Sequence, residues 1–104
     1  MIKKKVIRII SLDEFGKNIV IFGQFDFCEM QKIVDVAEGL HMVCLGFINL
    51  QEDTYFNYIQ AKDIESELKI LEENTKLSQD LLSTLFKAAD LSVKSYAYIK
   101  IEGL

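Results

Sequence analysis

The sequence predicts an α+β fold: a single domain over residues 1–104, with a largely antiparallel sheet and its helices packed on one side. Half of the 104 residues are apolar, which is enough for one hydrophobic core. The chain contains no proline and only five glycines, so no flexible linker divides it. Its apolar residues recur with strand or helix periods in the order β-β-α-β-β-α-α-β.

The first two predicted strands are residues 4–10 and 18–25. β-Branched residues dominate the first. The second contains the unbroken apolar run from Ile19 to Phe22, which is typical of a strand covered on both faces. The connector between them, residues 11–17, is short and polar and allows an antiparallel hairpin.

A helix is predicted over residues 26–39, where the period of the apolar residues changes from two to between three and four. Asp26 is the expected N-cap, and Glu29 stands three residues later in the capping-box position. Gly39 is expected to supply the left-handed residue that ends the helix.

Two further strands are predicted after this helix. Residues 42–50 form a mostly apolar run and are expected to be a buried strand. Residues 51–53 are polar and predict a turn, and residues 54–60 predict a strand of mixed polarity.

The last three predicted elements are two helices and a strand. Leucine-rich stripes at helical spacing predict helices over residues 63–73 and 77–89. Residues 93–102 alternate between apolar and polar more regularly than any other segment, which predicts a strand. Tyr96 and Tyr98 are expected on its partly solvated face.

The sequence contains no motif for catalysis, for a metal or for a cofactor, so we expect neither enzymatic activity nor a bound cofactor. Cys28 and Cys44 lie in apolar surroundings and predict two buried free thiols. His41 is the only histidine, and we expect a structural or solvent-facing role for it. Glycine-rich phosphate loops and hydrolase elbows are both missing from the sequence.

Acidic residues are concentrated in the middle of the chain. Residues 26–80 contain twelve acids and four lysines, a net charge of −8 against −4 for the whole chain. The acids are densest in residues 52–73, where aromatic residues accompany them. They suit the solvated side of ordinary helices, and they equally suit a surface that attracts a basic protein. The residues predicted to bind such a partner are Glu52, Asp53, Tyr55, Tyr58, Asp63, Glu65, Glu67, Glu72 and Glu73.

Other locations and partners are less compatible with the sequence. No apolar run approaches the roughly 18 residues that a membrane-spanning helix requires. Charged residues from Arg8 onward interrupt the apolar stretch that a signal peptide would need, so a cytoplasmic location is expected. Nucleic acid is not an expected partner, because the chain is acidic and has no dense basic stripe.

In overall character the chain resembles the immunity proteins of bacterial contact-dependent toxin systems, which are small, cytoplasmic and often acidic. The resemblance is carried by size, charge and the lack of catalytic motifs, and it transfers no residue role. It implies an inhibitory protein that blocks a basic toxin, such as a nuclease. Two alternatives remain open: a regulatory or scaffold module that self-associates as a homodimer, and a phage-encoded inhibitor of host defence.

Overall fold

The predicted α+β class is confirmed by a computed structural model, which describes residues 5–104. Its elements are β1 (Val6–Leu12), β2 (Asn18–Asp26), α1 (Phe27–Gly39), the 3-10 helix η1 (Leu45–Phe47), β3 (Thr54–Phe56), α2 (Tyr58–Leu71), α3 (Gln79–Ser95) and β4 (Tyr98–Glu102). Residue 4, with which the first predicted strand begins, lies outside the described residues. No helix within the described part of the chain is both long and apolar enough to cross a membrane.

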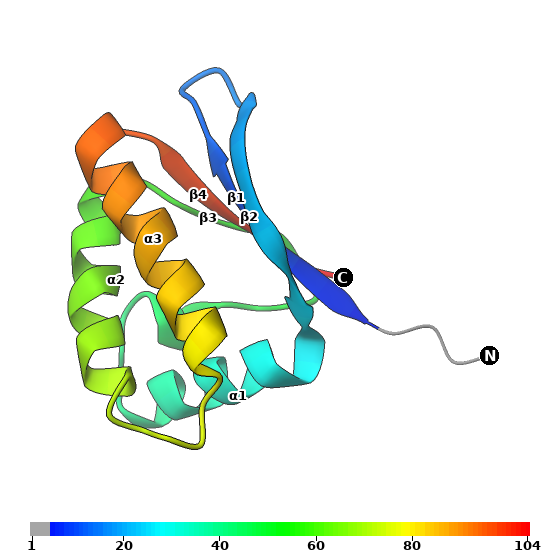
Figure 1. The fold of residues 1–104 in the computed structure, drawn as a ribbon, viewed down its shortest axis with the longest axis vertical. Helices are drawn as coiled ribbons and strands as arrows, with labels where there is room; N and C mark the ends of the chain where they lie inside the picture. The colour runs from blue at the N-terminus through cyan, green and yellow to red at the C-terminus, as the bar shows by residue number, and fades with distance from the viewer. Residues whose placement is uncertain (1–4) are drawn as a thin grey trace.

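The four strands form one sheet in the order β2-β1-β4-β3, and every neighbouring pair is antiparallel. The helices lie on one side of it, as the sequence predicts (Figure 1). α3 packs on the sheet, α2 packs on α3, and α1 lies across the end opposite the β1–β2 hairpin. The core lies between the sheet and the helices and includes Ile7, Ile9, Leu81 and Ile99, which are almost completely buried.

The first helix begins as predicted and ends differently. The Asp26 carboxylate accepts a hydrogen bond from the Glu29 backbone N–H at 3.3 Å, which confirms the N-cap. Gly39, however, is still helical, and His41 adopts the left-handed conformation with φ of 58°. The N–H groups of His41 and Met42 donate to the carbonyls of Glu38 and Ala37, the two hydrogen bonds of a Schellman motif.

The strand predicted over residues 42–50 is wrong. This segment forms turns and the short helix η1, and it packs on α1 instead of joining the sheet. Five of its residues are buried and Val43 and Phe47 are exposed, an alternation that only Leu45 interrupts, yet the segment pairs with none of the four strands. A continuous apolar run does not by itself distinguish a strand from another buried segment.

Two predicted element boundaries also shift. α2 begins at Tyr58, because Asn57 and Gln60 form a reciprocal capping box that starts a helix five residues before the predicted 63. The strand predicted over residues 54–60 is therefore shorter than expected and consists of β3 alone. α3 continues to Ser95, and Tyr96 ends it in the left-handed conformation with φ of 55°. The predicted strand 93–102 thus begins only at Tyr98, and Tyr96 is not part of it.

β2 is an edge strand, which corrects the expectation that it is covered on both faces. Ile19 and Ile21 are about half exposed. The pairing of β1 with β2 contains two register shifts, so β2 is irregular along its length. Such irregularities disfavour the addition of a further strand to an exposed edge.

Candidate functional site

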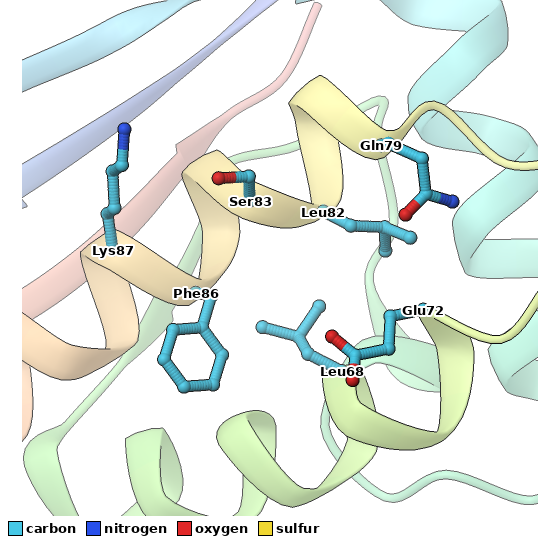
Figure 2. A pocket seen from close by; sticks show the side chains of 7 residues that line it. All are labelled: Leu68, Glu72, Gln79, Leu82, Ser83, Phe86 and Lys87. Carbon is cyan, nitrogen blue, oxygen red and sulfur yellow. The ribbon is translucent and has the colours of Figure 1, made fainter.

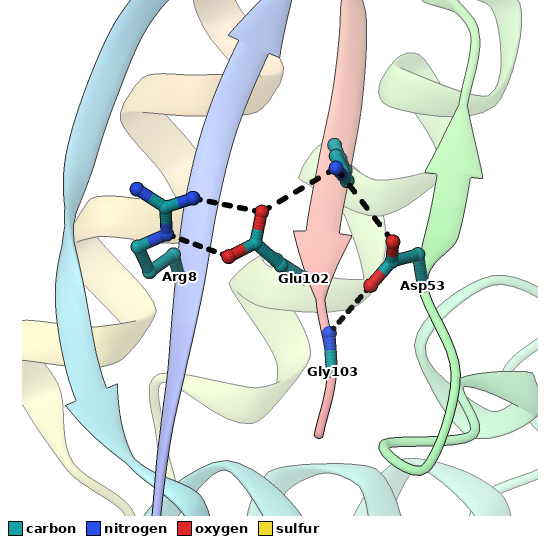
Figure 3. Close-up of polar contacts among 5 residues, drawn as sticks. Arg8, Asp53, Glu102 and Gly103 are labelled. Atoms are coloured by element: carbon teal, nitrogen blue, oxygen red, sulfur yellow. Dashed lines mark hydrogen bonds and ion pairs between the residues drawn. The ribbon is translucent and has the colours of Figure 1, made fainter.

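The residues predicted to bind a partner lie in several separate parts of the molecule. Asp53 lies just before β3, on the sheet face that no helix covers within the described residues (Figure 3), and the ring of Tyr55 in β3 lies near Lys100, with which Asp53 pairs. Tyr58 begins α2, and its ring packs edge-on against that of Tyr96 with centroids 4.9 Å apart. The remaining acids, apart from the exposed Glu52, lie on α2 or just after it. The predicted residues therefore do not form one patch.

The acids of α2 point in two directions, because consecutive helical residues turn by about 100°. Asp63 lies close enough to Cys44 for its charge to raise the pKa of that thiol, after the larger effect of burial and that of Glu67. The pKa of Lys94 in α3 is raised mainly by its hydrogen bond to Asp90. Glu65 lies close enough to Lys94 for its charge to raise the pKa of that lysine as well. Glu72 and Glu73 are exposed at the end of the helix.

Glu67 is not a surface residue, which corrects its predicted role in steering a partner. Its side chain is only 8% exposed. Both carboxylate oxygens accept hydrogen bonds from the backbone, one from Cys44 at 3.1 Å and the other from Leu45 at 2.8 Å. These N–H groups stand at the start of η1, where a helix has no internal partner for them. The sequence signal for this burial is that Glu67 lies at helical spacing between Ile64 and Leu71.

Residues 40–47, which include the backbone that Glu67 holds, expose three apolar side chains and one histidine, and we call Leu40, His41, Val43 and Phe47 the Phe47 surface. Val43 is 66% exposed and Phe47 is 79% exposed, and both Leu40 and His41 face solvent. A hollow of about 480 Å³ beside them is also lined by Glu38, Gly46 and Ile48. An exposed apolar group around a hollow is typical of a protein-binding surface.

This surface is built on a fixed backbone. The Schellman motif holds its first residues, and Glu67 holds the N–H groups of Cys44 and Leu45. Gly46 lies against α1 so closely that an added Cβ would come within 3.1 Å of the Ala37 carbonyl oxygen. Because the segment is ordered by folding, binding a partner would not require the further loss of backbone entropy there.

Acidic side chains flank the Phe47 surface. Glu38 lines the hollow, and Asp63 lies near Cys44 in the same segment. Burial, together with the charges of Glu67 and Asp63, raises the pKa of Cys44 to about 11. Of the acids predicted as a partner site, Asp63 therefore lies near the segment that carries the Phe47 surface.

The uncovered face of the sheet carries a row of paired charges (Figure 3). Arg8 Nε and Nη2 donate to the two carboxylate oxygens of Glu102 at 2.7 and 2.9 Å. Lys100 Nζ lies 3.4 Å from Glu102 and 3.6 Å from Asp53, and 5.9 Å from the centre of the Tyr55 ring. The hydrogen bond from Arg8 holds the pKa of Glu102 below its usual range, although burial opposes the shift. Both cations of this row, Arg8 and Lys100, are thus paired with carboxylates, which disfavours phosphate binding on this face.

The two cysteines lie in different environments. Cys44 is buried, as predicted, and its raised pKa keeps the thiol protonated at neutral pH. Cys28 is exposed on α1, which corrects its predicted burial; both thiols are free. The described residues contain no group of three or more histidine, cysteine, aspartate or glutamate side chains that could hold a metal ion.

No family model, curated protein or solved structure matches this chain.

Proposed function

We propose that this chain is an inhibitory protein that binds a basic protein partner through the Phe47 surface. The observation that carries the proposal is the use of a buried carboxylate, Glu67, to hold a segment whose apolar side chains point to solvent. Exposed apolar side chains such as Phe47 add little to the free energy of folding, yet Glu67 holds the backbone that presents them. Binding a partner would account for this arrangement.

The charges near the surface support a basic partner. Glu38 lines the hollow beside it, Asp63 lies near Cys44 of the same segment, and the chain as a whole is acidic. Acids around an apolar centre attract a positively charged protein and then remain partly solvated at the rim of the interface. A basic toxin, such as the nuclease that an immunity protein neutralises, has the required charge, and we propose a toxin of this kind as the partner.

The proposal is tested by purifying the tagged chain from its native host in parallel with two variants, Phe47→Asp and Phe15→Asp. Phe15 is the matched control, because it is 80% exposed and lies in the β1–β2 hairpin, at the end of the sheet opposite α1. We expect the wild type and Phe15→Asp to retain a basic protein and Phe47→Asp to lose it, with affinity reduced at least about 30-fold, as for a central interface anchor.

Two results would contradict this expectation. Recovery of the wild-type chain alone at low and at moderate salt would show that it has no tight partner. Loss of the partner in Phe15→Asp and its retention in Phe47→Asp would move the interface to the hairpin.

Self-association is the second candidate, and it is favoured by the half-exposed Ile19 and Ile21 on the edge strand β2. Sedimentation of the purified chain separates the two candidates. A monomer over the whole accessible concentration range would remove simple homodimerisation, whereas a concentration-dependent dimer that Ile21→Lys abolishes would favour it.

A further inference from the structure

A second hollow, between α2 and α3, combines apolar walls with an acidic rim (Figure 2). Its volume is about 340 Å³. Leu68 of α2 and Leu82 of α3 are almost completely buried and form its floor, and Phe86 of α3 lies at one side. The hollow is separate from the Phe47 surface, since the two share no lining residue.

The carboxylate of Glu72 is directed into this hollow in Figure 2. It is exposed and forms no hydrogen bond or ion pair with other side chains of residues 5–104. Lys87 is the only cation among the lining residues, and its ammonium group extends away from the hollow over the other side of α3. The charge that faces a bound group is therefore negative.

An apolar floor below a free carboxylate selects a ligand that has a hydrocarbon stem and a cationic end. Arginine has both, because its methylene groups pack on apolar surface while the guanidinium group remains hydrated or paired. The planar guanidinium group can form two parallel hydrogen bonds with a carboxylate and stack on an aromatic ring. Glu72 and Phe86 provide these two groups at one hollow.

We propose that the hollow between α2 and α3 binds an arginine side chain presented by another protein. The stem packs on Leu68 and Leu82, and the guanidinium group pairs with Glu72 beside the ring of Phe86. This site does not depend on the Phe47 surface, although the basic partner proposed above would carry suitable arginines. Of the acids predicted from the sequence to bind a partner, Glu72 is the one that lines this hollow.

The site is tested by NMR titration of the ¹⁵N-labelled chain with N-acetyl-arginine amide. The matched neutral probe is N-acetyl-citrulline amide, which has nearly the same shape and no charge. We expect saturable shifts of the amides of Leu68, Leu82 and Phe86 with the arginine probe, with a dissociation constant on the order of 1 mM. The citrulline probe is expected to cause no saturable shift.

Variants separate the role of Glu72 from general charge. Glu72→Gln is expected to weaken binding at least about tenfold, as for the loss of a charge-assisted hydrogen-bonded pair. Glu73→Gln removes the same charge from the next residue and is expected to bind as the wild type does. Lys87→Gln is expected to bind at least as tightly as the wild type, because it removes the nearby cation.

The proposal is overturned if the shifts do not saturate, if citrulline binds equally, or if Glu73→Gln weakens binding as much as Glu72→Gln. Loss of binding in Lys87→Gln would also overturn it, because removing a cation should not weaken a site that attracts a cationic side chain. Phe47→Asp is expected to leave the titration unchanged, so failure of the proposed function and failure of this site give different results.

Discussion

Glu67 adds little to the surface charge of α2, because its carboxylate is turned inward to the backbone of Cys44 and Leu45. A buried carboxylate is stabilised when both of its oxygens accept hydrogen bonds. The two N–H groups benefit equally, since no other backbone group is positioned for them at the start of η1. One side chain thus connects α2 to the segment that carries the Phe47 surface.

Replacing Glu67 with alanine should therefore destabilise the protein. We expect Glu67→Ala to lower the free energy of unfolding by about 3 kcal/mol, because it leaves two buried N–H groups without an acceptor. Urea denaturation measures the change. Glu73→Ala, which removes an exposed acid just beyond the same helix, serves as the control and should change stability by less than about 0.5 kcal/mol. Equal effects of the two substitutions would show that the Glu67 hydrogen bonds do not stabilise the fold.

Among the secondary-structure elements, those with strong local signals could be predicted from the sequence. The N-cap at Asp26 and the leucine stripe of α3 depend on residues close in the chain, and both predictions are confirmed. The segment 42–50 could not be predicted, because its burial depends on packing against α1 and on Glu67, which lies 22 and 23 residues from its two donors. Local apolar composition does not encode such contacts.

The candidate sites were less predictable than the fold for the same reason. Counting acids along the chain found Glu72, which lines the hollow between α2 and α3, and Asp63, which lies near Cys44, but it also included the buried Glu67. The exposed Phe47 was missed, since an apolar residue inside an apolar run is expected to be buried. The pair of Arg8 and Glu102 joins residues 94 positions apart and has no local signal at all.

That pair connects β1 to β4 and should make the stability of the sheet depend on pH. The hydrogen bond from Arg8 lowers the pKa of Glu102 in the folded state. A lowered folded-state pKa means that the stabilisation is fully present above the usual carboxylate pKa and is lost as the pH falls through the lowered value. It should therefore disappear in the acidic range, below about pH 4.5.

We expect the wild type to lose more stability than Glu102→Gln when urea denaturation is repeated from about pH 6 down to about pH 3. Glu52→Gln removes an exposed carboxylate near the same end of β4 and is expected to keep the pH dependence of the wild type. If Glu102→Gln and the wild type lose stability in parallel over this range, the ion pair does not contribute to the stability of the sheet.

Within the described residues, exposed apolar side chains occur on several elements, and two of these regions can be compared as partner sites. Phe47 and Val43 extend from the segment next to α1, while Ile19, Ile21 and Phe15 lie on β2 and its hairpin at the edge of the sheet. The two regions differ in how firmly hydrogen bonds hold their backbone. Glu67 and a Schellman motif fix the first, whereas β2 is an irregular edge strand. This difference is why we place the partner on the Phe47 surface.

The most direct test of that placement is hydrogen–deuterium exchange of the chain, free and with the partner that it retains from its host. The account predicts that binding slows exchange in residues 40–48 and leaves the β1–β2 hairpin unchanged, because an interface excludes water from the backbone that it covers. Protection confined to β2 and the hairpin, with residues 40–48 exchanging as in the free chain, would contradict the account.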